Sequence, residues 1–318
     1  MDTQSTFCEE EMKKTSPNKR RVVFFMQGFI FSALVFWSLN SAQNGLESYL
    51  YADISRPIAN LALASSARSS EAPLEIKAKA ALVKKIGANG REKFIYKLDG
   101  DDPIPLASLT KLMTATIVLE NKDRYDYDEL VLVSSAAASQ DDVPVFGNLT
   151  AKDEYTIKEL LELMLQYSSN DAAFQLSEVI GTSNFVDKMN NKAAELGLDS
   201  TVFFNPSGLD LSNGDTNMSS PKDMVDLTEY ILENHSEILE MTARMPAYLT
   251  VNGIHSLEFW DGQVLVGGKT GYTAKAGGCM IVVSRNSQNT TYINAVFGAD
   301  SAESRVREMQ KLINLSNN

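Results

Sequence analysis

The spacing of apolar residues predicts that the first structured part of the chain is a β-hairpin followed by a helix. Residues 78–83 and 94–98 are apolar runs of strand length. Between them, the sequence GANG at residues 87–90 has the composition of a tight turn. Residues 108–119 then carry apolar side chains at every third or fourth position, which predicts a helix.

The middle of the chain is predicted to be helical, and strands return after it. Four stretches have helical spacing of apolar residues: 157–165, 172–179, 184–196 and 221–233. Strand-like runs follow at 247–251, 264–268, 279–284 and 292–297, before a final helix over 302–315. Because sequential strands joined by short turns pair antiparallel, we expect an α/β fold of the α+β type. Its mainly antiparallel sheet would be flanked by helices and carry an all-helical lobe.

The N-terminus has the pattern of a membrane-insertion segment. Five basic residues at positions 13–21 precede a run without charges, residues 22–39, which is near the minimum length that spans a bilayer. Basic flanks stay in the cytoplasm. We therefore predict a cytoplasmic tail (1–21), a single-pass anchor in the cell membrane (22–39), a linker (40–76) and an extracytoplasmic domain (77–318).

A cleaved signal peptide that secretes this domain is the alternative. The charge-free run is longer than the usual apolar region of a signal peptide. Asn40 also departs from the small residues that signal peptidases read. Both features favour a retained anchor.

Composition removes several classes of function. The net charge of −12 argues against a nucleic-acid-binding protein and against broad adhesion to anionic lipid. Neither of the two histidines, His235 and His255, lies in a metal-binding pattern, so we expect no metal and no cofactor. Cys8 and Cys279 fall on opposite sides of the predicted membrane, so we expect no disulfide between them.

Three short motifs in a fixed order carry the candidate chemistry. They are Ser108-x-x-Lys111, Ser168-x-Asn170 and Lys269-Thr270-Gly271. The intervals are 60 residues (108 to 168) and 101 residues (168 to 269). The first two patterns also occur elsewhere in the chain, but Lys-Thr-Gly occurs once. This order and spacing indicate a serine acyl-transfer enzyme.

Ser108 and Lys111 have the arrangement of a nucleophile and its base. They lie one turn apart on the same face of the predicted helix. A serine hydroxyl is a weak nucleophile until a base takes its proton. Lys111 can be that base only when neutral, a state favoured by burial or by a nearby charge such as Lys269. Alone, Ser108 would be read as a helix cap; the other two motifs favour catalysis.

The second motif offers a proton relay and a positioning group. Ser168 could pass a proton between Lys111 and a leaving amine. The amide of Asn170 has donors and an acceptor with which to orient Lys111 and a substrate amide. The alternative is a polar connector between two helices, with one of these residues capping the second.

The third motif is a candidate substrate-binding strand. Lys269 and Thr270 suit a substrate carboxylate. We expect the glycines at 267–268 and 277–278 to let a substrate approach closely and add as a strand. The backbone N–H groups of Ser108 and Tyr272 are candidates for an oxyanion hole. The alternative is a glycine-rich hairpin with an exposed lysine.

Residues 77–315 resemble the D-alanyl-D-alanine carboxypeptidase family, the low-molecular-mass penicillin-binding proteins. The resemblance rests on the three motifs and on the matching stretches 107–115, 169–173, 189–190, 194–197, 205–210 and 268–273. It implies a penicillin-binding-protein/β-lactamase-like fold. It also implies removal of the terminal D-alanine from peptidoglycan stem peptides through an acyl-serine intermediate, and acylation by β-lactam antibiotics.

The chain departs from the family pattern in places. Ser169 stands where the family usually has glycine, which predicts a stiffer loop. Residues 252–260 replace the usual asparagine-rich stretch before Lys-Thr-Gly, a change that bears on substrate preference. Arg305 resembles a family arginine close to the substrate carboxylate, although a first-turn arginine is more often solvated. We therefore expect Thr270, Gly271, Tyr272 and Arg305 to bind substrate.

Three other functions stay open at this point. A D,D-endopeptidase would use the same site on a different leaving group. A class A β-lactamase would need a glutamate about 35–40 residues after the second motif. That region reads FFNPSGL (203–209), and the nearest candidate, Glu195, lies within a predicted helix. A non-catalytic peptidoglycan-binding module is less consistent with a full set of reactive side chains.

Overall fold

The computed structural model describes residues 74–318, apart from 141–146, 245–252, 260–261 and 317–318. The chain divides into two units at Pro73, and the fold described below is that of the second unit, Pro73–Asn318. The predicted anchor at 22–39 and the predicted strand at 247–251 lie outside the described residues. In the described part of the chain, no helix has both the length and the apolar character needed to cross a membrane.

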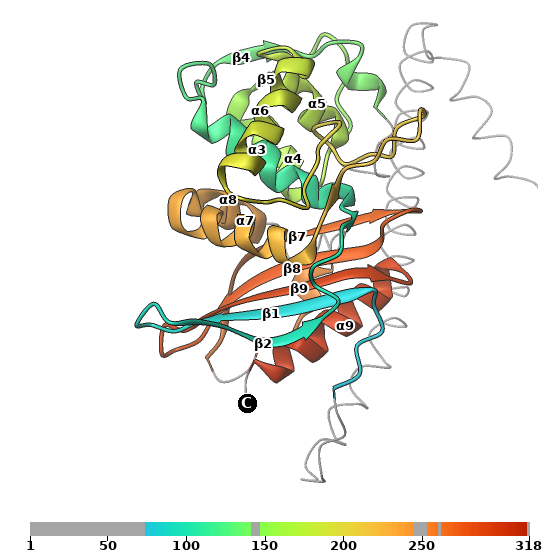
Figure 1. Ribbon diagram of the computed structural model, residues 1–318. Coiled ribbons are helices and arrows are strands. Elements are labelled where there is room, and N and C mark those ends of the chain that lie inside the picture. Colours follow the sequence, from blue (N-terminus) through green and yellow to red (C-terminus); the bar gives the residue numbers. More distant parts are fainter. Residues whose placement is uncertain (1–73, 141–146, 245–252, 260–261, 317–318) are drawn as a thin grey trace, which may run out of the picture. The chain divides into compact units, whose positions relative to one another are not determined.

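A five-stranded antiparallel sheet forms the base of the second unit (Figure 1). Its strands are β1 (Ala80–Ile86), β2 (Glu92–Leu98), β7 (Val264–Thr273), β8 (Gly277–Arg285) and β9 (Thr291–Ala299). Their order is β2-β1-β9-β8-β7, and every neighbouring pair is antiparallel. The predicted fold class is confirmed, and the predicted hairpin is β1 and β2.

Alternating residues of the sheet build two hydrophobic cores. In β9, Tyr292 and Val296 pack with the final helix α9 (Ala302–Leu315), whereas Ile293, Ala295 and Phe297 pack towards the helices on the other face. This period of two is what a strand buried on both faces requires. Nearly all of β9 is therefore apolar and buried.

The helical lobe lies above the β7 edge of the sheet (Figure 1). The lobe and the helices beside it are α3 (Thr110–Glu120), α4 (Ile157–Gln166), α5 (Asn170–Glu178), α6 (Thr182–Glu195), α7 (Pro221–Asn234) and α8 (Ser236–Ala243). Local sequence fixes several helix starts: Thr156 and Glu159 form a capping box for α4, and Ser220 caps α7 before Pro221. One of these helices, α8, was not predicted from the sequence.

Short elements connect these layers. Two small ribbons pair β3 (Ile104–Pro105) with β6 (Met218–Ser219), and β4 (Leu130–Leu132) with β5 (Glu154–Thr156). Three 3₁₀ turns are η2 (Ala107–Leu109), η3 (Ala137–Ser139) and η5 (Ile254–Ser256). Strands of two or three residues are too short to show a period of two, so the apolar pattern did not reveal them.

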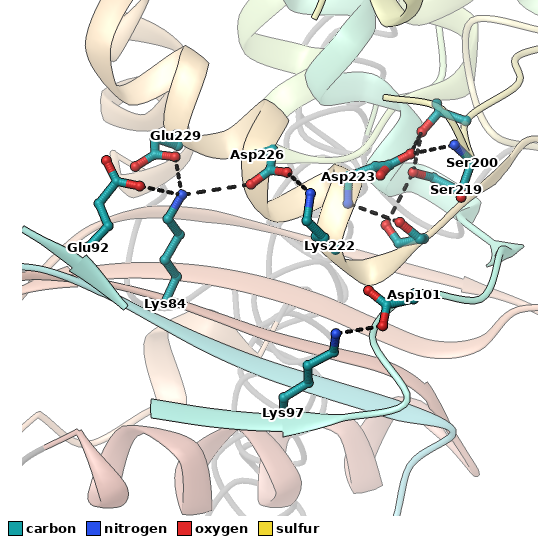
Figure 2. Close-up of polar contacts among 12 residues, drawn as sticks. Lys84, Glu92, Lys97, Asp101, Ser200, Ser219, Lys222, Asp223, Asp226 and Glu229 are labelled. Atoms are coloured by element: carbon teal, nitrogen blue, oxygen red, sulfur yellow. Dashed lines mark hydrogen bonds and ion pairs between the residues drawn. The ribbon is translucent and has the colours of Figure 1, made fainter. Parts of the chain in front are cut away.

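An ion-pair network joins the hairpin to α7 (Figure 2). The ammonium group of the buried Lys84 contacts the carboxylate of Glu229, and it lies 2.9 Å from Glu92 and 3.7 Å from Asp226. Lys222 holds Asp226 from its other side at 2.7 Å. On the next strand, Lys97 instead pairs with the exposed Asp101. The lysine that faces the helix is thus neutralised within the fold.

Candidate active site

Ser108 lies in the 3₁₀ turn η2 immediately before α3. The turn is entered through Ala107, whose φ of 47° is unusual for a residue other than glycine. The Ser108 side chain caps neither η2 nor α3, since no side-chain cap hydrogen bond is formed at either helix. The capping interpretation is therefore wrong, and the hydroxyl is available for other contacts.

Lys111 is fully buried, and its ammonium group donates three hydrogen bonds. The acceptors are Ser108 Oγ at 2.9 Å, Asn170 Oδ1 at 2.7 Å and the carbonyl oxygen of Ser207 at 2.8 Å. Three donors are all that a lysine ammonium has. The predicted nucleophile, base and orienting amide thus meet at one nitrogen atom.

The loop at residues 205–209 is a part of the site that sequence reasoning matched but gave no role. Asn205 Oδ1 accepts hydrogen bonds from the backbone N–H groups of Ser207 and Gly208, at 3.1 and 2.7 Å. Thr114 Oγ1 donates to the Pro206 carbonyl at 2.6 Å. These bonds aim the Ser207 carbonyl at Lys111. The signal in the sequence is the string NPSGLD, which combines turn-forming residues with an asparagine able to bond to its own loop.

Gly208 is required by the close approach of this loop to η2. Its φ is +88°, and a side chain there would place Cβ 1.9 Å from the Ala107 carbonyl oxygen. On the opposite side of η2, a Cβ at Gly271 would lie 2.9 Å from the backbone nitrogen of Ser108. Two glycines therefore let the Ser108 turn lie between the 205–209 loop and β7.

Ser168 and Lys269 form the second half of the site. Lys269 Nζ donates to Ser168 Oγ at 2.8 Å and to the Thr270 carbonyl at 3.0 Å. Ser168 has a φ of 64°, in the left-handed region. Ser108 follows Ala107, which also has a positive φ. Such conformations cost free energy and are held by surrounding contacts. Ser169 supplies two: its Oγ accepts from Ala172 N–H and donates to the Gly147 carbonyl.

The pKa of Lys269 is held well below its usual value. Burial is the largest cause, and the charges of Lys111 and Arg305 add to it. The side chain of Lys269 is 1% exposed. Burial and a second lysine were expected from the sequence to lower the pKa of Lys111; in the structure these two causes act on Lys269.

Arg305 is buried at the start of α9 and contacts the third motif. Its Nη1 donates to the Gly271 carbonyl at 2.8 Å, and burial lowers the pKa of its guanidinium. Its Nε is buried and has no hydrogen-bond partner among the described residues. The solvated alternative is therefore wrong. In β7, Thr270 is buried, whereas Tyr272 is 53% exposed.

Two of the glycines around the third motif are required by the packing of the fold itself. A Cβ at Gly267 would lie 2.3 Å from the Leu239 carbonyl of α8, and one at Gly278 would lie 2.4 Å from the Ser301 carbonyl before α9. They make room for neighbouring helices. The motif is also internal to β7, which runs on to Thr273, and does not end the strand. Since β7 is an edge of the sheet, its other side borders η2.

Other chemistries find no support at this site. Among the described residues, no cluster of histidine, cysteine or acidic side chains could hold a metal ion. His235 lies 3.4 Å from Glu120 at the far end of α3, and Cys279 is buried in β8. Glu195 pairs with Lys192, so it is engaged away from Lys111. Residues 203–209, where the sequence analysis looked for the glutamate of a class A β-lactamase, contain none, and the Ser207 carbonyl of this stretch accepts from Lys111.

Lys269→Met is expected to stabilise the protein at neutral pH. The unfolded chain has a lysine pKa of about 10.4, above that of the folded state, so between the two values the unfolded chain binds the extra proton. Wild-type stability therefore rises with pH across this window, and the advantage of Lys269→Met shrinks towards about pH 10.4. Urea denaturation at several pH values measures this, with Lys122→Met as an exposed control. A pH-independent deficit in Lys269→Met would contradict the assignment.

Comparison with known proteins agrees with this geometry. Residues 66–301 match the D-alanyl-D-alanine carboxypeptidase family. D-alanyl-D-alanine carboxypeptidase DacF of Bacillus subtilis is 32% identical over 70% of this chain and 59% of its own length. A D-alanyl-D-alanine endopeptidase of Pseudomonas aeruginosa is 31% identical over 64% of this chain and 66% of its own length. The chain thus spans less than two thirds of these curated relatives.

A solved structure extends the match to the fold. Penicillin-binding protein D2 from Listeria monocytogenes, determined with cefotaxime bound, has a TM-score of 0.65 at 30% identity. The match covers 78% of this chain and 100% of the Listeria chain. With the sequence match and the arrangement of the three motifs, it follows that this chain belongs to the D-alanyl-D-alanine carboxypeptidase family.

Proposed function

We propose that this protein is a serine-type D-alanyl-D-alanine carboxypeptidase that trims the terminal D-alanine from peptidoglycan stem peptides. The observation that carries the proposal is the 2.9 Å contact between Lys111 Nζ and Ser108 Oγ inside a buried network. A serine and a lysine at this distance have the geometry of a nucleophile and its base. No cofactor or metal enters the reaction.

Acylation requires Lys111 to lose one proton first. The neutral amine keeps two N–H groups for Asn170 Oδ1 and the Ser207 carbonyl, and its lone pair takes the proton of Ser108 Oγ. The oxygen then attacks the carbonyl carbon of the penultimate D-alanine. The backbone N–H groups of Ser108 and Tyr272 receive the oxyanion, a contact worth about 3–4 kcal/mol per donor in comparable sites. The nearness of Gly271 to the Ser108 nitrogen supports this pairing, since it sets β7 beside η2.

Collapse of the tetrahedral intermediate releases D-alanine and leaves acyl-Ser108. Ser168, which Lys269 holds by a hydrogen bond, relays the proton from Lys111 to the leaving amine, and this returns Lys111 to its neutral form. Water then attacks the ester while Lys111 takes a proton from it, and Lys111 gives that proton to Ser108 Oγ as the peptide acid leaves. A β-lactam enters by the same first step. Its carbonyl acylates Ser108 while its ring amine stays attached.

Recognition of the substrate's terminal carboxylate falls to Lys269 and Thr270, with Arg305 behind them. An anion brought next to Lys269 favours the charged form that burial disfavours. Binding of a free acid thereby couples to protonation of the lysine. The substrate backbone would lie along the edge of β7 that faces η2, where Tyr272 is exposed.

D,D-endopeptidase action is the second candidate. Relatives named D-alanyl-D-alanine endopeptidase match this chain about as well as those named carboxypeptidase, with 31% and 32% identity for two of them. Both activities use the same acyl-serine chemistry and differ in the leaving group.

We further propose that residues 22–39 anchor the protein in the cell membrane, with the domain outside the cytoplasm.

Ser108→Ala is expected to abolish hydrolysis and penicillin labelling together. The substrate is a pentapeptide ending in D-Ala-D-Ala, and mass analysis reports loss of one alanine. Labelled penicillin reports the acyl-enzyme. Ser139→Ala, an exposed serine of η3, is the matched control and should behave as wild type. Attachment of penicillin to Ser108→Ala at the wild-type rate would identify another nucleophile.

Lys269→Ala is expected to separate carboxypeptidase from endopeptidase action. Cleavage of the free-acid peptide should fall through loss of the charge-assisted bond, about 1.5–3 kcal/mol. Cleavage of the same peptide with an amidated C-terminus should be slow in both proteins and barely change. The ratio of kcat/KM for acid and amide measures the difference. Equal losses on both peptides would show that Lys269 acts only through its hydrogen bond to Ser168. That result would favour the endopeptidase.

A further inference from the structure

The β1–β2 hairpin is strongly basic in an acidic protein. Residues 80–98 carry five lysine or arginine side chains and one acidic residue, Glu92, a net charge of +4 in a chain whose net charge is −12. The hairpin forms one side of the sheet, with β2 as the edge opposite β7. Positive charge is therefore concentrated at the edge farthest from the strand that borders Ser108.

The fold neutralises only some of these cations. Figure 2 shows Lys84 directed at Glu92, Glu229 and Asp226, and Lys97 paired with Asp101. Glu92, the only acidic residue of the hairpin, is thereby engaged by Lys84. The cations that remain for an outside partner lie near the turn of the hairpin and on the face of the hairpin that points away from α7.

Lys85, Arg91 and Lys93 make up that charge, and we call them the tip cations. Lys85 lies directly opposite Lys93 in the β1–β2 register, and opposed like charges destabilise a strand pair. Within the described residues, none of the three forms an ion pair; Lys85 lies 5.6 Å from the centroid of the Tyr292 ring. With Gly87, Asn89 and Glu92 they line a pocket of about 380 Å³.

The position of the hairpin leaves the tip cations accessible. Successive strand residues face opposite sides, so Lys85 points away from α7, towards which Lys84 points. The turn extends beyond the ends of α7 and α9 (Figure 1). Asn89, Arg91 and Lys93 are exposed. An anionic surface could therefore meet the tip without displacing another element.

We propose that the tip cations dock the domain on the anionic phospholipid headgroups of the membrane. This rests on the proposed N-terminal anchor, which would hold the domain at a membrane surface. The net charge opposes broad adhesion, but a Debye length of about 8 Å lets a local patch act separately. Since β2 and β7 are opposite edges, docking through β2 turns Ser108 away from the membrane and towards the cell wall.

Energy transfer from the hairpin to the bilayer tests this in the full chain. Ala88→Cys, made with Cys8→Ser, carries a donor dye, and the vesicles carry an acceptor on their headgroups. Transfer should be higher in vesicles that contain phosphatidylglycerol than in phosphatidylcholine alone, and added salt should remove the difference. Each tip cation should change the equilibrium constant for docking by about fivefold, the effect of one basic residue at an anionic surface.

Charge reversal of the tip provides the control comparison. Lys85→Glu, Arg91→Glu and Lys93→Glu together should abolish the dependence on phosphatidylglycerol. Lys122→Glu, Lys152→Glu and Lys158→Glu make the same charge change on the helical lobe and should leave it intact. Flotation with neutral vesicles measures membrane binding through the anchor alone. Peptide cleavage measures the proposed activity, so failure of either can be told apart from failure of docking. Equal transfer in both lipids, or a response only to dissolved polyphosphate, would overturn the proposal.

Discussion

The three hydrogen bonds of the Lys111 ammonium group determine how the active site is assembled. Each acceptor belongs to a different segment: Ser108 to η2, Asn170 to the first turn of α5, and Ser207 to the 205–209 loop. A fully buried lysine without such partners would be costly. Its burial therefore requires all three segments to be in place, and their meeting point is where the nucleophile lies.

Close packing around η2 makes this arrangement possible. Gly208 and Gly271 lie on either side of the turn and leave no room for a side chain. Ala107 and Ser168 have positive φ, a strain that their neighbours offset. Lys269 adds a second constraint, because its burial beside Lys111 and Arg305 disfavours its own charge. An anionic substrate bound beside Lys269 favours the charged form of this lysine, so binding of the substrate and protonation of Lys269 stabilise each other.

The sequence predicted the sheet, most of the helices and the set of residues that meet at the site. The long strands and helices were recognisable because each buries a regular face, as β9 and α4 do. Helix α8 was missed because only His235 separates it from α7. The packing role of Gly267 and Gly278 was missed, since the sequence shows that a glycine is present but not which neighbour needs the space. Arg305 was predicted to bind substrate only from the family resemblance, because burial of a first-turn residue depends on distant packing against β7.

The central claim is that Lys111 removes the proton of Ser108. The most direct measurement is the single-turnover rate of penicillin acylation in Lys111→Arg, which retains the positive charge but cannot lose its proton. Positioned general bases contribute about 10²–10⁴-fold, so the rate should fall by that order while initial penicillin binding is retained. An acylation rate equal to that of the wild type would contradict the account.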